Sequence, residues 1–237
     1  MARGIYSPCQ RMLMDIFSAI LEALPYILEG TLVTLLLVLG ALMLGFCFGV
    51  PMAVAQAYGP RFLSGLVGTY VWFFRGVPVL LLLFLFYYGL FPLLNFDVGT
   101  IGASCIVLGM TSAAYQSQIF RGSILSIPSG QFKAGTAMGM NKMQTIIHVI
   151  LPQALRLSIP GWSNEYSILL KDSAMCFALG TPEIMARTHF VASRTYQHLP
   201  LYITAGIIYF IITLIGVSLL RKLENKVRIP GYNNAGA

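Results

Sequence analysis

Acidic residues are scarce in this chain. Only eight of its 237 residues are Asp or Glu, against 15 Lys and Arg, and charged residues make up 10% of the sequence. A soluble domain usually carries about 25% charged residues. No acid lies between Glu29 and Asp97, or between Asp97 and Glu165. In a chain that is 57% hydrophobic with a mean hydropathy of +0.77, such gaps exclude an ordinary soluble domain and indicate an integral membrane protein.

Several motifs are also missing. There is no G-x-x-x-x-G-K-[ST] phosphate loop, so we expect that the chain does not bind ATP itself. The four cysteines fit no zinc or disulfide spacing, and the three histidines are too isolated for a metal site. No paired nucleophiles occur, which argues against a membrane-embedded enzyme and leaves no catalytic residue to name. The basic residues are scattered at the ends of apolar runs, which indicates a lipid bilayer as partner and no nucleic acid.

Five apolar runs are present, and they predict an all-α integral membrane protein with five transmembrane helices. They cover about residues 30–57, 66–94, 98–119, 157–170 and 201–220. The first run carries glycines that suit close helix packing. "FRGVP", residues 74–78, interrupts the second run, and its Gly76 and Pro78 should bend or break the helix. The fourth run is short, and Asn164 and Glu165 intrude in it.

The segment before the first run is amphipathic. Asp15, Glu22 and Glu29 recur every seven residues and share one helix face, so this segment is expected to lie on the membrane surface. The sequence therefore divides into an N-terminal interfacial segment (1–29), a transmembrane domain (30–222) and a cytoplasmic tail (223–237).

The basic residues also predict the orientation. Five spans with the N-terminus outside place more Lys and Arg in the cytoplasm than outside. The cytoplasmic set is Arg61, Arg121, Lys133, Lys142, Arg156, Arg221, Lys222, Lys226 and Arg228, and the outer set is Arg3, Arg11, Lys171, Arg187 and Arg194. Arg75 falls inside a span, where we expect it to anchor the helix by extending its charge to the interface.

The stretch "GQFKAGTAMGMNKMQTIIHVILPQA", residues 130–154, contains no acid although apolar runs lie on both sides. Gly139 can adopt a left-handed backbone, which predicts a turn between two short helices. Met143, Ile146, Ile147 and Ile150 follow helical spacing and should form one apolar face. Pro152 should then stop or kink the helix. The stretch is either a projecting helix–turn–helix or a cytoplasmic loop folded against its own spans.

The chain resembles the polar amino-acid permeases of ABC importers, of the histidine/glutamine/arginine type. The resemblance rests on six blocks in the family's order: "EGTLVTLLL" (29–37), "FFRGVPVLLLLFLFYYG" (73–89), "SAAYQSQIFRGSILSIPSGQ" (112–131), "MGMNKMQTIIHVILPQALRLSIPGWSNE" (138–165), "LLKDSAM" (169–175) and "ASRTY" (192–196). It implies the type I importer permease fold and import by alternating access.

The resemblance also implies partners. In that family the 130–152 loop docks in a groove of a cytoplasmic ATPase, which binds ATP-Mg; the permease itself holds no cofactor. Two ATPase subunits, a second permease copy or a close relative, and an extracytoplasmic binding protein complete the importer. The docking residues would be Lys133, Ala134, Ala137, Met138, Gly139, Met140 and Met143. Lys133 stands where the family usually has Glu, and Gly135 where it has Ala, so the partner ATPase is expected to carry compensating residues.

Two acids mark a candidate ligand site. Glu165 and Asp172 are seven residues apart and share one face if a helix continues between them. An acid near the bilayer centre costs about 2.5–3.5 kcal/mol on insertion scales and normally faces a cavity or a partner. The resemblance favours contact with a cationic amino acid, such as arginine, lysine, histidine or an opine. The full candidate set is Glu165, Asp172, Thr111, Tyr115, Gln118 and Asn164; Thr111 and Gln118 replace the family's usual Asn and Glu.

These residues are also compatible with purely structural roles and with another class of transporter. Lys171 or a neighbouring Arg could neutralise the two acids at the outer interface. The polar side chains of the third span could serve only to join helices by hydrogen bonds; they are Thr111, Ser112, Tyr115 and Gln118. An ion channel or a proton-coupled carrier would also carry intramembrane acids, and transport independent of ATP would identify it.

Overall fold

The computed structural model describes residues 8–227, with side chains from residue 17 onward, and every regular element in that range is helical. The elements in order are α1 (Pro8–Tyr58), α2 (Arg61–Gly76), α3 (Val79–Phe84), η1 (Leu85–Leu90), α4 (Phe91–Leu93), α5 (Thr100–Ser126), α6 (Ser129–Ala137), α7 (Lys142–Thr145), η2 (Ile146–Ile150), α8 (Leu151–Leu157), α9 (Ile159–Asp172), η3 (Ser173–Leu179), α10 (Ile184–Thr195) and α11 (His198–Val227). Most of the expected tail, residues 228–237, lies outside the described residues.

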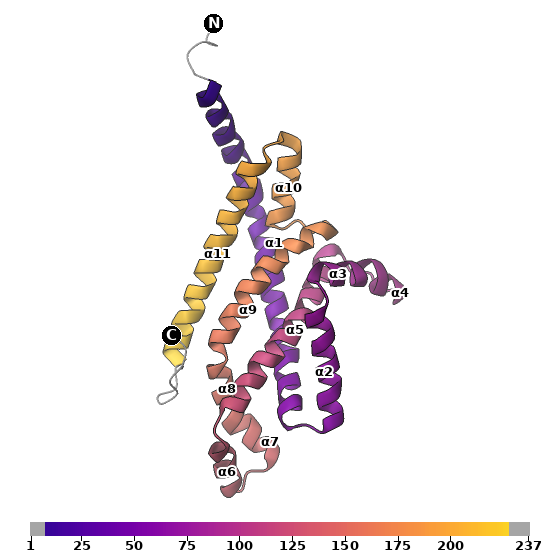
Figure 1. Ribbon diagram of the computed structural model, residues 1–237, viewed down its shortest axis with the longest axis vertical. Coiled ribbons are helices and arrows are strands. Elements are labelled where there is room, and N and C mark those ends of the chain that lie inside the picture. The colour runs from indigo at the N-terminus through magenta and orange to yellow at the C-terminus, as the bar shows by residue number, and fades with distance from the viewer. Residues whose placement is uncertain (1–7, 228–237) are drawn as a thin grey trace.

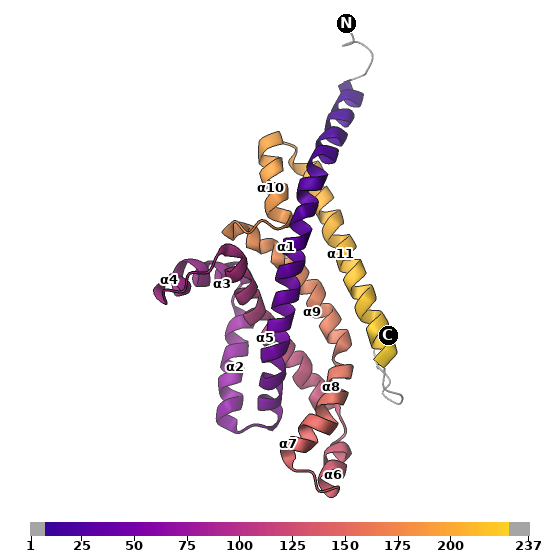
Figure 2. The same ribbon diagram turned by 180° about the vertical axis from the view of Figure 1, so that it is seen from behind.

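Helices α1, α2, α5, α9 and α11 run roughly along the long axis of the molecule (Figures 1 and 2). Helices α6 and α7 form one end, and α10 lies toward the other (Figure 1). The central α5 packs most extensively against α1. A glycine of α1 contacts α5 closely, as the sequence predicted: a Cβ on Gly45 would overlap the side-chain amide of Gln116. Close approach of α1 and α5 therefore depends on small residues in the first apolar run.

The second apolar run is broken where the sequence indicated. Helices α2 and α3 meet at an angle of 106°, and Val77 and Pro78 between them have extended backbones. Proline cannot continue the hydrogen-bond ladder, and the residue before it avoids the helical region. The result is a lateral arm, α3 to α4, that projects from the bundle (Figure 1).

Much of the exposed surface of the helices is apolar. Leu32 of α1, Trp72 of α2 and Phe210 of α11 are among the many large apolar side chains that remain exposed. Two helices, α1 from Phe17 and α11, are long and apolar enough to cross a membrane, and the bent pair of α2 with α3–α4 counts as a third. A soluble monomer rarely exposes so much contiguous apolar surface.

The described cysteines are unpaired. Cys47, Cys105 and Cys176 are free, and the side chain of Cys9 lies outside the described residues. These thiols serve as small apolar side chains.

Helix α1 differs from the expected boundary at residue 29. It runs unbroken from Pro8 to Tyr58, whereas we expected a separate interfacial helix to precede the first span. Gly30 does not interrupt α1. Its missing side chain instead allows a close helix contact, since a Cβ there would stand 2.8 Å from the backbone of Glu183 and Ile184. The position of residues 1–29 relative to the bilayer stays a prediction.

Substituting Gly30 with Ala should lower the unfolding temperature. Backbone atoms of the segment before α10 occupy the space for the new methyl group, and overpacking of this kind costs about 1–3 kcal/mol. Thermal unfolding of the detergent-purified protein measures the change. Gly206→Ala in α11 is the matched control, since no atom lies within 4 Å of its Cβ position. Equal unfolding temperatures for both variants would contradict the close packing at Gly30.

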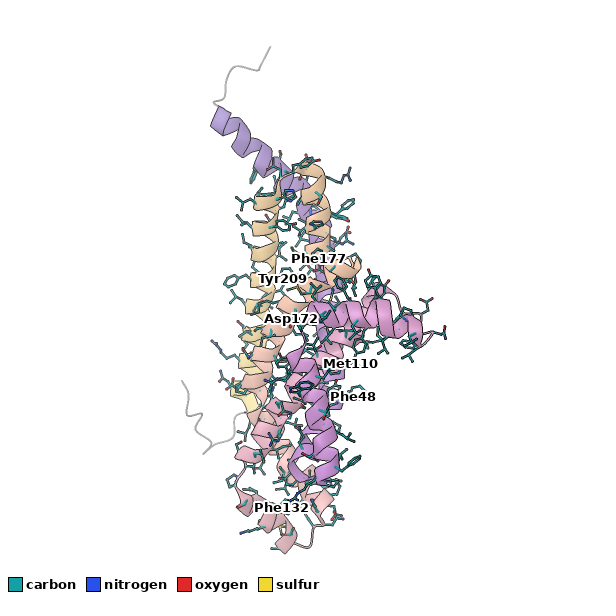
Figure 3. All side chains as sticks on the ribbon, turned by 45° about the vertical axis from the view of Figure 1, so that its right-hand side comes forward. Phe48, Met110, Phe132, Asp172, Phe177 and Tyr209 are labelled. Carbon is teal, nitrogen blue, oxygen red and sulfur yellow. The ribbon has the colours of Figure 1, made fainter. Side chains whose placement is uncertain are left out.

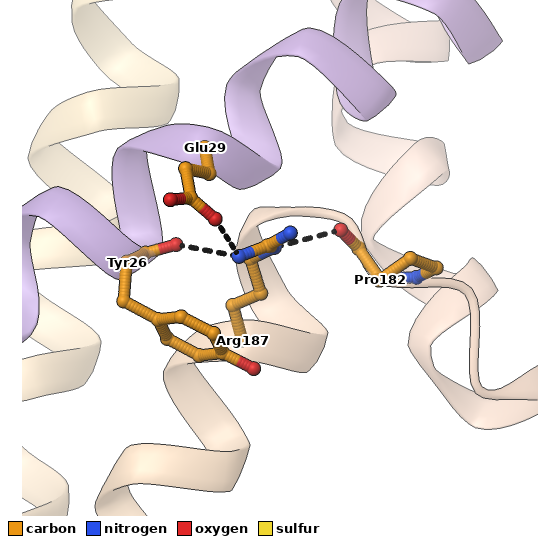
Figure 4. A network of polar contacts seen from close by, with 4 residues as sticks. All are labelled: Tyr26, Glu29, Pro182 and Arg187. Carbon is orange, nitrogen blue, oxygen red and sulfur yellow. Dashed lines mark hydrogen bonds and ion pairs between the residues drawn. The ribbon is translucent and has the colours of Figure 1, made fainter.

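Arg187 of α10 contacts α1 close to the point where Gly30 packs against Glu183 and Ile184 (Figure 4). Arg187 Nη1 lies 2.6 Å from Glu29 Oε2 and donates to Tyr26 O at 3.1 Å. Its Nε donates to Pro182 O at 3.2 Å, and its guanidinium stands 4.6 Å from the centroid of the Tyr26 ring. The Glu29 side chain is 67% exposed and that of Arg187 only 18%. The arginine, rather than the ion pair alone, holds the two helices together.

Arg187→Ala should therefore destabilise the protein more than Glu29→Ala does. An exposed ion pair contributes about 0.2–1 kcal/mol, but removal of Arg187 also removes the hydrogen bonds to Pro182 O and Tyr26 O and the contact with the Tyr26 ring. The two unfolding temperatures in the same detergent test this order. Equal losses would mean that the ion pair carries the whole contribution.

Candidate functional site

A chain of polar side chains crosses the middle of the bundle. Ser112 Oγ donates to Glu165 Oε1 at 2.7 Å, which joins α5 to α9. Gln116 Nε2 donates to Ser112 Oγ at 3.0 Å and to Leu42 O of α1 at 3.1 Å. Trp162 Nε1 donates to Gln116 Oε1 at 2.6 Å. Glu165 is only 3% exposed, so a buried carboxylate is held by hydrogen bonds at the junction of three helices.

The sequence indicated part of this chain of hydrogen bonds. Ser112 and Gln116 are four residues apart in α5, and Trp162 and Glu165 are three apart in α9, so each pair shares a helix face. We did not predict Gln116 or Trp162 as site residues. A glutamine inside an apolar run was the available signal, because a buried amide needs partners for both its donor and its acceptor groups.

Asp172 is the last residue of α9 and lies two turns beyond Glu165. Helix α9 is continuous from Ile159 to Asp172, so the expected shared face exists. Asp172 is partly exposed and lies about midway along the molecule, far from Phe132 at the α6 end (Figure 3). Within the described residues neither acid has an ion-pair partner, although Lys171 interacts electrostatically with Asp172 and Asp172 with Glu165.

Arg75 lies close to this region, and its expected anchoring at the membrane interface stays a prediction. Its guanidinium carbon stands 4.9 Å from the centroid of the Tyr115 ring on α5. Tyr115 lies one turn beyond Ser112, and Arg75 interacts electrostatically with Glu165. The break after Gly76 ends α2 here, which leaves Arg75 on the last turn of its helix. The structure thus adds one cationic group to the two acids.

The remaining candidates are placed differently. Thr111 is buried, and its hydroxyl donates to Val107 O within its own helix. Gln118 Nε2 donates to Gln56 Oε1 at 2.7 Å and so joins α5 to α1. Asn164 is exposed on α9 beside Glu165. Glu165 and Asp172 therefore lie on one face of α9, and Tyr115 lies one turn from the serine that holds Glu165. Thr111 and Gln118 make contacts within and between helices, and a ligand role for any of these residues remains a prediction.

The 130–152 segment forms the helix–turn–helix that the sequence indicated. Helices α6 and α7 meet at Gly139, whose φ of +83° lies in the left-handed region. Asn141 caps α7: its Oδ1 accepts from Gln144 N, and its own N donates to Gln144 Oε1, both at 2.9 Å. Gly135 is buried because the Thr145 methyl group occupies the place of its missing Cβ, at 2.7 Å. Glycine therefore stands where the two helices touch.

The apolar residues of this segment are only partly covered. Ile146 and Ile150 are buried, whereas Met143 and Ile147 are exposed, so one edge of the expected apolar face packs inside the permease and the other edge stays open. Of the two outcomes expected at Pro152, a stop or a kink, the stop does not occur, because α7, η2 and α8 are continuous. A π-helical turn, η2, precedes the proline, and this wider turn accommodates a residue that lacks an N–H group and crowds the preceding turn.

The segment is anchored to the end of α1. Lys142 Nζ donates to Tyr58 O at 2.7 Å, and the Tyr58 and Phe132 rings stack at 5.8 Å. The expected docking residues Lys133, Ala134, Ala137, Met138, Gly139 and Met143 are exposed, and Met140 is partly exposed. An apolar groove lined by Tyr58, Leu63, Met143 and Ile147 lies beside them. The molecule thus presents an apolar, acid-free surface at one end.

Comparisons with known proteins agree with this architecture. Residues 45–229 match the family described as "Binding-protein-dependent transport system inner membrane component". The arginine ABC transporter permease protein ArtQ of Haemophilus influenzae is 33% identical over 209 residues, covering 86% of this chain and 94% of the relative. The histidine/lysine/arginine/ornithine transport system permease protein HisM of Salmonella typhimurium is 30% identical over 211 residues, covering 85% and 89%.

The solved structure of "an amino acid ABC transporter with histidines" superimposes with a TM-score of 0.79 at 28% identity, over 89% of this chain and 98% of that chain. The helical bundle is therefore the permease fold of ABC importers. The chain belongs to the family of binding-protein-dependent transport system inner membrane components: it is a permease subunit of an amino-acid ABC importer, and ATP hydrolysis is carried out by a separate ATPase.

Proposed function

We propose that this permease imports cationic amino acids and that Glu165 and Asp172 bind the positive groups of the ligand. The observation that carries the proposal is the buried Glu165 carboxylate, which has one hydrogen-bond donor and no ion pair among the described residues. A carboxylate buried without a counter-ion is costly, and a cationic ligand would offset that cost. The names of the two relatives, which refer to arginine and to histidine, lysine, arginine and ornithine, support the same class of ligand.

The same set of helices supports a topology of five spans. Helices α1, α2, α5, α8–α9 and α11 lie along the long axis (Figure 2). With 27 residues, α5 is about 40 Å long, enough for the hydrocarbon core of about 30 Å. It carries buried Ser, Thr and Gln side chains, since neighbouring helices rather than lipid surround it. The basic residues then place the N-terminus outside and the C-terminus in the cytoplasm of a multi-pass cell-membrane protein.

We assign the α6–α7 surface to the ATPase. Met138 is 79% exposed and Met143 59% exposed, and methionine suits adaptable apolar docking. The surface lies at the opposite end of the molecule from α10 (Figure 1). A cytoplasmic ATPase could contact this end without approaching α10. Lys133 is exposed on α6, so its charge would meet the partner directly, and an acidic residue on the ATPase would complement it.

Transport would follow alternating access. Two ATPase subunits bind ATP-Mg and close, and they move the α6–α7 surfaces of two permeases, either identical copies or this chain with a close relative. The pathway between the permeases then opens outward, where an extracytoplasmic binding protein delivers the amino acid. Anchoring of α7 to the end of α1 by Lys142 supports this transmission, because α1 packs along the central α5.

The test is ATP hydrolysis by the complex reconstituted in lipid with its ATPase and binding protein, measured against a panel of amino acids. Arginine, lysine, histidine or ornithine should stimulate hydrolysis, and glutamate and aspartate should not. Stimulation by acidic amino acids would overturn the assignment of Glu165 and Asp172. Transport that continues without ATP would overturn the coupling mechanism.

A further inference from the structure

Arg75 is the charged group near the ligand site that the proposed function leaves unused. A cation within a span is expensive and normally faces a partner or a cavity. Here the guanidinium lies over Tyr115, and within the described residues it forms no hydrogen bond and no ion pair. The side chain is exposed, so its N–H donors are free to contact another molecule.

The geometry places this cation beside the acids without pairing it to them. Tyr115 and Ser112 are neighbours on one face of α5, about 4.5 Å apart along the helix axis. Ser112 holds the Glu165 carboxylate from that face, and the Tyr115 ring holds the Arg75 guanidinium. Neighbouring positions of one helix therefore hold a cation and an anion, with Asp172 two turns further along α9.

The charges of these three residues complement one class of ligand. Arginine, lysine and ornithine each carry two cationic groups and one carboxylate, and the site offers two carboxylates and one guanidinium. Without Arg75, two acids would repel the ligand's own carboxylate. A guanidinium presents parallel N–H donors that match a carboxylate in a bidentate arrangement.

We infer that Arg75 binds the α-carboxylate of the transported amino acid, while Glu165 and Asp172 bind its cationic groups. Arg75 then selects amino acids against amines of the same cationic chemistry that lack a carboxylate. The inference rests on the proposed function and adds a second requirement to it.

Isothermal titration of the purified permease–ATPase complex, without binding protein, tests this selection. The ligands are L-arginine and agmatine, which is arginine without its carboxylate. The wild-type complex should bind arginine more tightly than agmatine. Arg75→Ala should weaken arginine binding by about 10- to 100-fold, the loss expected for a charge-assisted hydrogen bond, and should leave agmatine binding unchanged. Arg75→Lys should retain part of the preference because it keeps the charge but not the fork.

Controls separate this inference from a structural role and from the proposed function. Arg61→Ala changes an exposed arginine at the opposite end of the same helix and should leave both affinities unchanged. Gel filtration and basal ATP hydrolysis verify that each variant assembles. If Arg75→Ala weakens arginine and agmatine equally, or weakens neither, the carboxylate contact is wrong although the cationic site stands. If the wild-type complex binds neither ligand, or binds glutamate in preference, the proposed ligand class fails and the inference fails with it.

Discussion

Glu165→Gln should abolish most of the stimulation of ATP hydrolysis by cationic amino acids while the complex still assembles. Glutamine keeps the volume of the side chain and can still accept the hydrogen bond from Ser112, so the substitution removes charge and little else. A hydrogen bond to a charged group contributes about 1.5–3 kcal/mol, which corresponds to roughly a 10- to 150-fold loss in ligand affinity. The concentration of arginine needed for half-maximal stimulation measures the loss.

Glu183 supplies a matched control for this prediction. It is also a buried glutamate, but its carboxylate caps α10 by accepting from Met185 N and Ala186 N, and it accepts from the Tyr209 hydroxyl as well. Glu183→Gln should lower stability without a change in the arginine concentration for half-maximal stimulation. Equal shifts in that concentration for both variants, or none for Glu165→Gln, would show that the Glu165 charge does not act on the ligand.

Met143→Glu should disconnect the ATPase from the permease. The substitution places a carboxylate on a surface that contains no acid between Gly130 and Ala154, beside an apolar groove that we assign to docking. A central apolar residue of an interface contributes about 2 kcal/mol or more, so the affinity for the ATPase should fall at least roughly 30-fold. Binding of the separately purified ATPase to immobilised permease measures this affinity.

Met143→Leu is the control for that variant, because it keeps an apolar side chain of similar volume and should preserve binding. The unfolding temperature of the permease should not change in Met143→Glu, since the Met143 side chain is 59% exposed. Unchanged ATPase binding by Met143→Glu would mean that the 130–152 segment is a loop of the permease and does not transmit motion.

Local features of the sequence predicted the helices and their breaks well. The bend at Gly76–Pro78 and the turn at Gly139 follow from residues that restrict or widen backbone choice at one position. The π-helical turn before Pro152 was not predicted, because a proline can end, kink or widen a helix and the neighbouring contacts select among these outcomes.

The ligand site was predicted only in part for a related reason. Periodicity placed Glu165 and Asp172 on one face of α9, which the continuous helix confirms. The sequence did not indicate which residues of α5 would contact the face of α9 that carries these two acids. Ser112 contacts Glu165, whereas Thr111, next to it in the chain, is turned toward its own helix.

The sequence by itself determined that this chain is a helical membrane protein, which family it resembles and that two rare acids share one face of α9. Apolar length, glycine, proline and charge act within one helix or one turn, so they can be evaluated along the chain. Only the tertiary structure decided that Gln116 and Trp162 support the buried carboxylate and that Arg75 lies over Tyr115. These contacts join α2, α5 and α9, and their register depends on how all the helices pack together, which no single segment encodes.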